Sequence, residues 1–280
     1  MKFNKPAIIF LILLFGANVF AQTKDLFLGI KLRPEVQSIV AEIEKKTGKK
    51  IYREFVEQRD FFLGSSYISE DGLAIIQVET TLEDTPEKLE AVIAHELLHL
   101  CLRVNNYPVF LFSPMIKTAK GLAQDVEQPN VNDLTSIIEH QIFKSEMKKF
   151  GLYDFIDLAG DTVKEAKMNK RRADGQADSI NYARAILEYQ NPKDIEDVRK
   201  AFEENGWKRA LKDGKEIADI ISRSKLQTPK DAENVFLKCV LILYASPNSS
   251  FILKLTPDPQ ITAYRQMIIN TAAKPKRRTR

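Results

Sequence analysis

Cysteine and histidine, two of the common metal-binding residues, are scarce in this sequence. Its 280 residues include two cysteines and three histidines. Cys101 and Cys239 form no Cys-x-x-Cys pair, which excludes a structural zinc finger. A disulfide between them stays open, because both lie in apolar segments where a buried free thiol is equally natural.

The sequence also lacks a strong excess of charge of either sign. It has 42 basic and 38 acidic residues, and the formal net charge of +4 does not by itself indicate a nucleic-acid-binding protein. Apolar residues make up 44% and charged residues 29% of the chain. This balance is typical of an ordinary globular protein and excludes a disordered or membrane-spanning class.

The N-terminus has the pattern of a secretory signal peptide. Lys2 and Lys5 precede an apolar run at 7–15, and Val19 and Ala21 are compact residues at positions −3 and −1 before a cleavage site after Ala21. The run is shorter than the roughly 20 apolar residues that span a bilayer. We therefore expect cleavage rather than an uncleaved anchor, a secreted or periplasmic protein, and no transmembrane span after cleavage.

The segment from Thr85 to Leu100 predicts a helix. Thr85 suits the N-cap position, and Pro86 suits the first turn, where no backbone donor is needed. Apolar residues at three- and four-residue steps would bury one face of this helix. They are Leu89, Val92, Ile93, Leu97 and Leu100.

Two of the three histidines lie on this predicted helix. His95 and His99 would be one turn apart and about 40° apart around the axis, so both imidazoles can reach one metal ion. Glu96 would point about 100° away from His95, where it can hydrogen-bond a water held by the metal and act as a general base. The alternative is a pair of hydrogen-bonded core histidines; their spacing around a glutamate favours the metal site.

A catalytic zinc needs three protein ligands and an exchangeable water. His140 is the first candidate for the third ligand, because it is the only histidine left in the chain. Its neighbour Glu139 is the alternative, since a carboxylate completes many such sites. The two side chains differ by about 100° on a helix, so periodicity does not separate them. The residue that is not a ligand could hydrogen-bond to one.

The remaining pattern predicts an α+β fold, with a small mixed sheet and a mainly helical C-terminal lobe. Segments rich in β-forming residues at 50–56 and 73–79 predict two strands. We expect a loop-like region from Asn105 to Pro114. Helical spacing of apolar residues recurs at 34–46, 133–150, 180–189, 195–202, 211–221 and 235–243.

The motif of His95, Glu96 and His99 resembles the His-Glu-x-x-His signature of the zincin metallopeptidases. The resemblance covers residues 73–150. It implies that the two histidines bind Zn²⁺ and that Glu96 activates a water for attack on a peptide carbonyl. It also implies that an edge strand of the sheet helps to bind an extended peptide substrate.

The chain departs from two better-known zincin patterns. The metzincin extension would place glycine and histidine at 102 and 105, where this chain has Leu102 and Asn105. A thermolysin-like helix would place aspartate at 143, where this chain has Phe143. The chain is therefore more similar to the minimal bacterial zincin-like proteins. Tyr153 or Tyr107 could stabilise an oxyanion, although each is more commonly a packing aromatic.

We accordingly divide the chain into four parts: a signal peptide at 1–21, a zincin-like catalytic domain at 22–160, a helical lobe at 161–272 and a basic tail at 273–280. The expected activity is zinc-dependent cleavage of a peptide or protein substrate. The alternative is a catalytically silent zincin-like binding or envelope-associated protein, whose basic tail could attract an anionic surface. No specific nucleic-acid partner is expected, and the sequence indicates no oligomeric state.

Overall fold

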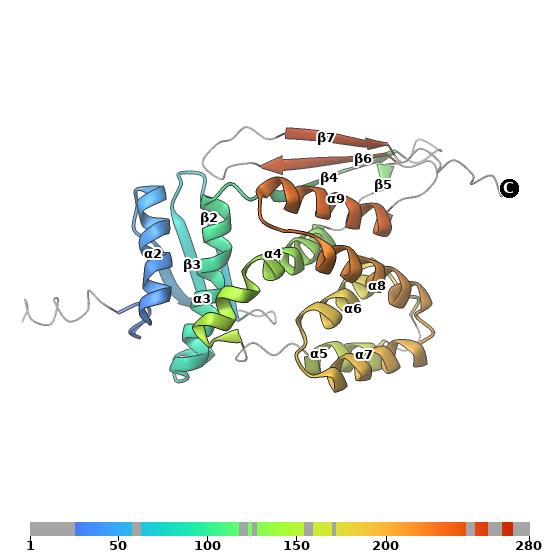
Figure 1. Cartoon of the computed structure of the whole chain (residues 1–280), viewed down its shortest axis with the longest axis horizontal. Helices are drawn as coiled ribbons and strands as arrows, with labels where there is room; N and C mark the ends of the chain where they lie inside the picture. The colour runs from blue at the N-terminus through green and yellow to red at the C-terminus, as the bar shows by residue number, and fades with distance from the viewer. Residues whose placement is uncertain are drawn as a thin grey trace, which may run out of the picture.

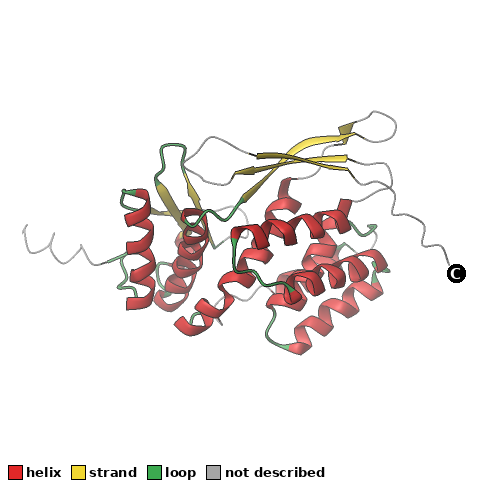
Figure 2. Ribbon diagram, turned by 45° about the horizontal axis from the view of Figure 1, so that its top comes forward, coloured by secondary structure: helices red, strands yellow, loops and turns green. Residues whose placement is uncertain are grey.

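The fold is α+β, as predicted, with a small mixed sheet followed by a mainly helical region (Figures 1 and 2). The computed structural model describes residues 26–57, 63–117, 123–124, 128–153, 159–169, 172–244, 250–256 and 265–270. The predicted signal peptide at 1–21 and the basic tail at 273–280 lie outside these residues.

The first part of the chain builds a three-stranded sheet covered by two helices. Its elements are α2 (Pro34–Thr47), β1 (Tyr52–Val56), β2 (Gly64–Ile68), β3 (Ala74–Glu79), the short 3₁₀ helix η1 (Thr80–Leu82) and α3 (Pro86–Val104). The strand order is β1-β3-β2, with β1 parallel and β2 antiparallel to β3. Ala74, Ile76 and Val78 are buried, and the residues between them are less so, as expected for a central strand with helices on one face.

Helix α3, which carries the histidine motif, is buried on most of its circumference. It starts at Pro86 as predicted and runs to Val104, one turn past the predicted end. Its buried residues are Leu89, Ala91, Val92, Ile93, Ala94, Glu96, Leu97, Leu98, Leu100 and Leu102. His95 and His99 keep partial exposure, so the side of the helix that carries both histidines is the less covered one.

Helix α4 (Gln128–Phe150) takes part in two hydrophobic cores. Its second half contributes Phe143 and Met147 to the first core, which also contains α2, α3 and the three-stranded sheet. Its first half contributes Leu134 and Ile138 to the second core, with α6, α8 and α9. His140 therefore lies where the helix passes from one core to the other.

The C-terminal region is mainly helical, as predicted. Its helices are α5 (Ala159–Met168), α6 (Gln176–Glu188), α7 (Pro192–Glu204), α8 (Lys208–Arg223) and α9 (Pro229–Tyr244). All but α5 correspond to helices expected from the sequence. A third cluster around Phe202 and Trp207 joins α5, α6 and α7. None of the described helices has both the length and the apolar character needed to cross a membrane.

A second, four-stranded sheet lies along one side of the molecule (Figures 1 and 2). Its strands are β4 (Val109–Lys117), β5 (Ala123–Gln124), β6 (Ser250–Thr256) and β7 (Arg265–Asn270), all antiparallel in the order β5-β4-β6-β7. The predicted loop-like region was therefore wrong from Val109 onward. Pro114 suggested a loop, yet it lies at a register shift between Ser113 and Lys117, where a strand tolerates proline.

Candidate metal centre

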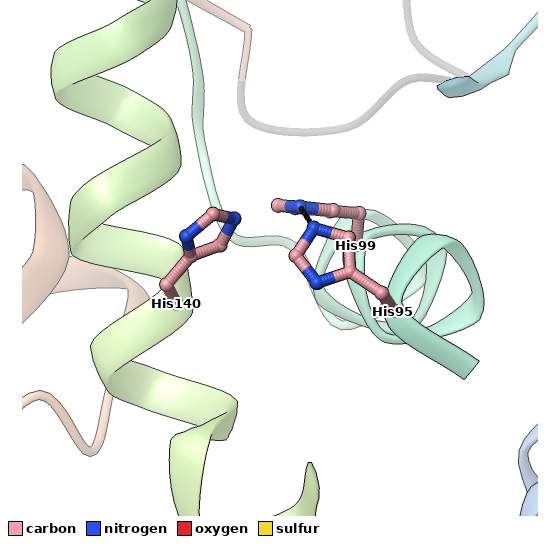
Figure 3. A group of neighbouring side chains, drawn as sticks. All are labelled: His95, His99 and His140. Atoms are coloured by element: carbon pink, nitrogen blue, oxygen red, sulfur yellow. Dashed lines mark hydrogen bonds between the residues drawn. The ribbon is translucent and has the colours of Figure 1, made fainter. Parts of the chain in front are cut away.

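The structure brings the three predicted histidine ligands together. His95 and His99 come from α3 and His140 from α4, and Figure 3 shows a nitrogen of His140 turned toward the other two rings. One ligand atom from each residue lies within 4.8 Å of the others. The Nε2 atoms of His95 and His99 are 3.1 Å apart. This is a hydrogen-bonding distance, and with both nitrogens unprotonated the same pair could bind one cation.

The spacing of His95 and His99 matches that of two ligands of one tetrahedral metal ion. Two nitrogens at the usual zinc–nitrogen distance of about 2.0–2.1 Å would lie roughly 3.3 Å apart, close to the 3.1 Å between His95 and His99. The His95 ring meets the rings of His99 and His140 at steep angles of 75° and 68°, so the three rings are not stacked on one another. All three side chains keep partial exposure, as a site with an exchangeable fourth ligand requires.

Glu139, the alternative third ligand, lies behind His99 instead of among the donor atoms. Its Oε2 is 2.7 Å from Nδ1 of His99, and its Oε1 is 2.6 Å from a guanidinium nitrogen of Arg103. Burial alone would raise the pKa of Glu139, but the charge of Arg103 and the contact with His99 outweigh it and lower the pKa. An ionised Glu139 can accept a hydrogen bond from Nδ1–H of His99, which leaves Nε2 of His99 unprotonated and able to bind a metal.

Glu188 has the same relationship to His140, and the sequence analysis missed it. It lies at the end of α6, and its Oε1 is 2.8 Å from Nδ1 of His140. Burial would raise the pKa of Glu188, but His140, then Arg184 and Lys144, lower it. The one local signal is an acidic residue in the last turn of a helix, where the helix dipole disfavours negative charge.

Glu96 lies on α3 beside these ligands and is held by the neighbouring strand. Its side chain is buried, and Ser66 of β2 donates a hydrogen bond from Oγ to Oε2 at 2.7 Å. Burial raises the pKa of Glu96, while His99 and the Ser66 hydroxyl oppose that rise. A carboxylate with a raised pKa is closer to the operating pH that favours a general base.

Phe143 forms an apolar wall beside the three histidines. Its ring stands edge-on to His95 and His99, with centroid distances of 5.4 and 5.0 Å and interplanar angles of 90° and 89°. It also lies 5.5 Å from the His140 ring. Phe143, which stands where a thermolysin-like helix has an aspartate, therefore covers one side of the histidine cluster with an apolar ring. This ring limits the access of solvent to that side.

The two tyrosines considered for oxyanion binding have packing and hydrogen-bonding roles in the structure. The Tyr153 hydroxyl donates to the backbone carbonyl of Glu188 at 3.1 Å. Tyr107 packs against both the first and the second core, and burial raises its pKa. Stabilisation of an oxyanion by either residue stays a prediction.

No protein-family model, curated protein or solved structure matches the chain. Neither Cys101 nor Cys239 belongs to the group of ligand atoms, and both are free thiols in the structure, so they form no disulfide there.

Proposed function

We propose that this protein is an exported zinc-dependent metallopeptidase. The observation that carries the proposal is the convergence of His95, His99 and His140 from two helices, with the carboxylate of Glu96 beside them. Zinc is the proposed metal because three protein ligands with an open position are typical of catalytic zinc sites. Imidazole also suits copper, iron and nickel, so the identity of the metal is part of what the experiment below measures.

Bound zinc would supply acidity to a water molecule and polarise the carbonyl of the scissile peptide bond. The residues of this chain would do the rest. His95, His99 and His140 would hold the ion, while Glu139 and Glu188 keep His99 and His140 in the orientation that leaves one nitrogen free. Glu96 would take a proton from the attacking water and deliver it to the leaving amine.

The free edge of β2 supports a peptide as the substrate. At the two ends of the β2–β3 pair, Glu79 N donates to Leu63 O and Ser69 N donates to Leu73 O. The odd-numbered residues of β2 therefore form the backbone hydrogen bonds with β3. In an antiparallel pair the backbone groups alternate in direction. The backbone groups of Gly64 and Ser66 therefore point away from β3, and no other strand in the described part of the chain pairs with that side.

This edge lies next to the proposed general base. Ser66 directs its side chain to Glu96 while its backbone groups point outward. An extended peptide that adds to β2 through main-chain hydrogen bonds would therefore run past the metal centre. Main-chain recognition of this kind favours a peptide or protein substrate over other amides or esters.

The decisive experiment combines metal content with hydrolysis. The chain without residues 1–21 would be loaded with zinc and incubated with a broad peptide library, with chelator-treated protein as one control and Glu96→Gln as the other. We expect cleavage by the loaded protein only, and a Glu96→Gln variant that retains zinc but loses cleavage. Zinc binding without cleavage would reject the peptidase and favour a binding protein; cleavage by Glu96→Gln would reject the role of Glu96.

A further inference from the structure

The third histidine occupies a junction in this fold. On α4, Ile138 belongs to the second core and Phe143 to the first, with His140 between them. The other two histidines lie on α3, which packs wholly in the first core. A metal held by all three residues would therefore depend on how α4 is fixed between the two cores.

The ring of His140 is fixed from the helical region. Its Nδ1 faces Oε1 of Glu188 at 2.8 Å, and the two residues are 48 positions apart in sequence. The Glu188 side chain is 10% exposed, so solvent does not compete strongly for this contact. The Nε2 atom lies 3.0 Å from the Ser136 hydroxyl, a rotatable group that can move aside for a cation.

The end of α6 that carries Glu188 is itself anchored to α4 and to the segment after it. Lys144 donates to the Leu187 carbonyl at 2.5 Å, and Tyr153 donates to the Glu188 carbonyl at 3.1 Å. An ammonium group at a helix C-terminus is favourable for the helix dipole. Arg184 lies on the far side of the Glu188 carboxylate, with 3.8 Å between Nε and Oε2. The backbone at the end of α6 is thus held independently of His140, and the carboxylate has a further ion pair with Arg184.

We infer that Glu188 is a positioning residue of the metal centre, and that helix α6 through it sets the affinity of the protein for the metal. The inference rests on the metal site of the proposed function, but not on peptide cleavage. The carboxylate accepts a hydrogen bond from Nδ1–H of His140. This bond fixes the tautomer in which Nε2 is unprotonated and makes Nε2 a better electron-pair donor to a cation. A histidine that rotates freely would lose these advantages.

The test is a zinc affinity measurement on Glu188→Gln and Glu188→Ala, by competition with a chromophoric chelator. We expect the Ala variant to bind zinc about 10- to 100-fold more weakly, the usual effect of removing a carboxylate behind a ligating histidine. The Gln variant keeps the shape and an acceptor oxygen, so we expect a smaller loss. Because its fold is least disturbed, the Gln variant decides the test if the Ala variant does not fold.

Asp178→Asn is the matched control. Asp178 lies on the same helix, is also buried, and is paired with two guanidinium nitrogens of Arg172 at 2.6 and 2.7 Å. Its loss should lower the thermal stability but leave the zinc affinity unchanged. Cobalt titration followed by visible absorption gives a second readout, which should change in the Glu188 variants and not in Asp178→Asn.

Wild-type zinc affinity in Glu188→Gln and Glu188→Ala would overturn the inference, and so would equal losses of affinity in Asp178→Asn. A wild type that binds no metal would overturn the site and this inference together. A wild type that binds zinc but cleaves no peptide would overturn only the peptidase, since the affinity comparison is made without a substrate.

Discussion

Ser66 and Glu96 are joined by a hydrogen bond of 2.7 Å from Oγ to Oε2, which ties the free-edged strand β2 to the motif helix α3. The contact is close because the strand residue two positions earlier is Gly64. A Cβ atom there would lie 2.7 Å from Cγ1 of Val92 and 3.0 Å from Cγ of Glu96. The small side chains of β2 thus allow the strand and the proposed general base to meet.

Ser66→Ala should lower kcat about tenfold and leave KM nearly unchanged. The Ser66 hydroxyl fixes the orientation of the Glu96 carboxylate, and an orientation effect on the order of 1.5 kcal/mol, the size of one hydrogen bond to a charged group, corresponds to that factor in rate. The Ser66 hydroxyl lowers the pKa of Glu96, so its removal should shift the acidic limb of the kcat/KM profile to higher pH. Ser66→Thr, which keeps the hydroxyl, should restore both; an unaltered pH profile in Ser66→Ala would contradict this role.

Gly64→Ala should separate β2 from α3 and reduce both stability and activity. Relief of the contacts with Val92 and Glu96 requires backbone movement, with an expected cost of about 1–3 kcal/mol for overpacking. Urea denaturation measures the loss of stability. The control is Ser65→Ala, since Ser65 contacts Gln77 instead of α3. Wild-type stability in Gly64→Ala would show that the strand and helix are not closely packed.

The metal-free protein should lose stability as the pH falls below about 6.5. Burial, then the charges of His140 and His99, lower the pKa of His95 well below its ordinary value of 6.5. Below that pH the unfolded chain binds a proton at His95 that the folded chain does not bind, so unfolding is favoured, by up to about 1.4 kcal/mol per pH unit. Above 6.5 this residue makes no such contribution.

Urea denaturation of the metal-free protein at pH 7.5 and 5.5 measures this effect. Glu96, Glu139 and Glu188 also titrate differently in the folded state, so the same pair of measurements on His95→Gln isolates the histidine. We expect the variant to lose less stability between the two pH values. Equal losses in the two proteins would mean that the folded protein accommodates a charged His95.

Both cysteines should titrate as free thiols without added reductant. Burial raises the pKa of Cys101 to about 11 and that of Cys239 to about 12, so neither forms the reactive thiolate at pH 8 in the folded protein. A thiol reagent should therefore react slowly with the native protein. After denaturation it should react readily with both cysteines. The absence of thiols in the denatured, unreduced protein would show that they had paired.

The motif was predictable because its residues are close in sequence. Helical periodicity places His95, Glu96 and His99 on known sides of one helix, and the structure groups the two histidines with His140. The choice between Glu139 and His140 could not be made from the sequence. Adjacent residues on a helix point in different directions, so the choice requires the rotation of α4 about its own axis relative to α3. Contacts with α6 supply this rotation, and no local pattern encodes them.

The supporting residues were hidden for a different reason. Ser66 and Glu188 are 30 and 48 positions from the residues they hold, and sequence spacing carries no information at such distances. Strand β2 was also missed, because Gly64, Ser65 and Ser66 have the composition of a loop. The close approach to α3, which excludes larger side chains at Gly64, accounts for that composition.

The most direct test of the metal centre is elemental analysis of the purified protein, with His95→Ala, His140→Ala and Glu139→Ala compared with the wild type. We predict one zinc per wild-type chain, loss of zinc in both histidine variants, and retained but weaker binding in Glu139→Ala. Zinc retained in His140→Ala and lost in Glu139→Ala would make Glu139 the third ligand. A wild-type protein that holds no metal after zinc loading would contradict the account.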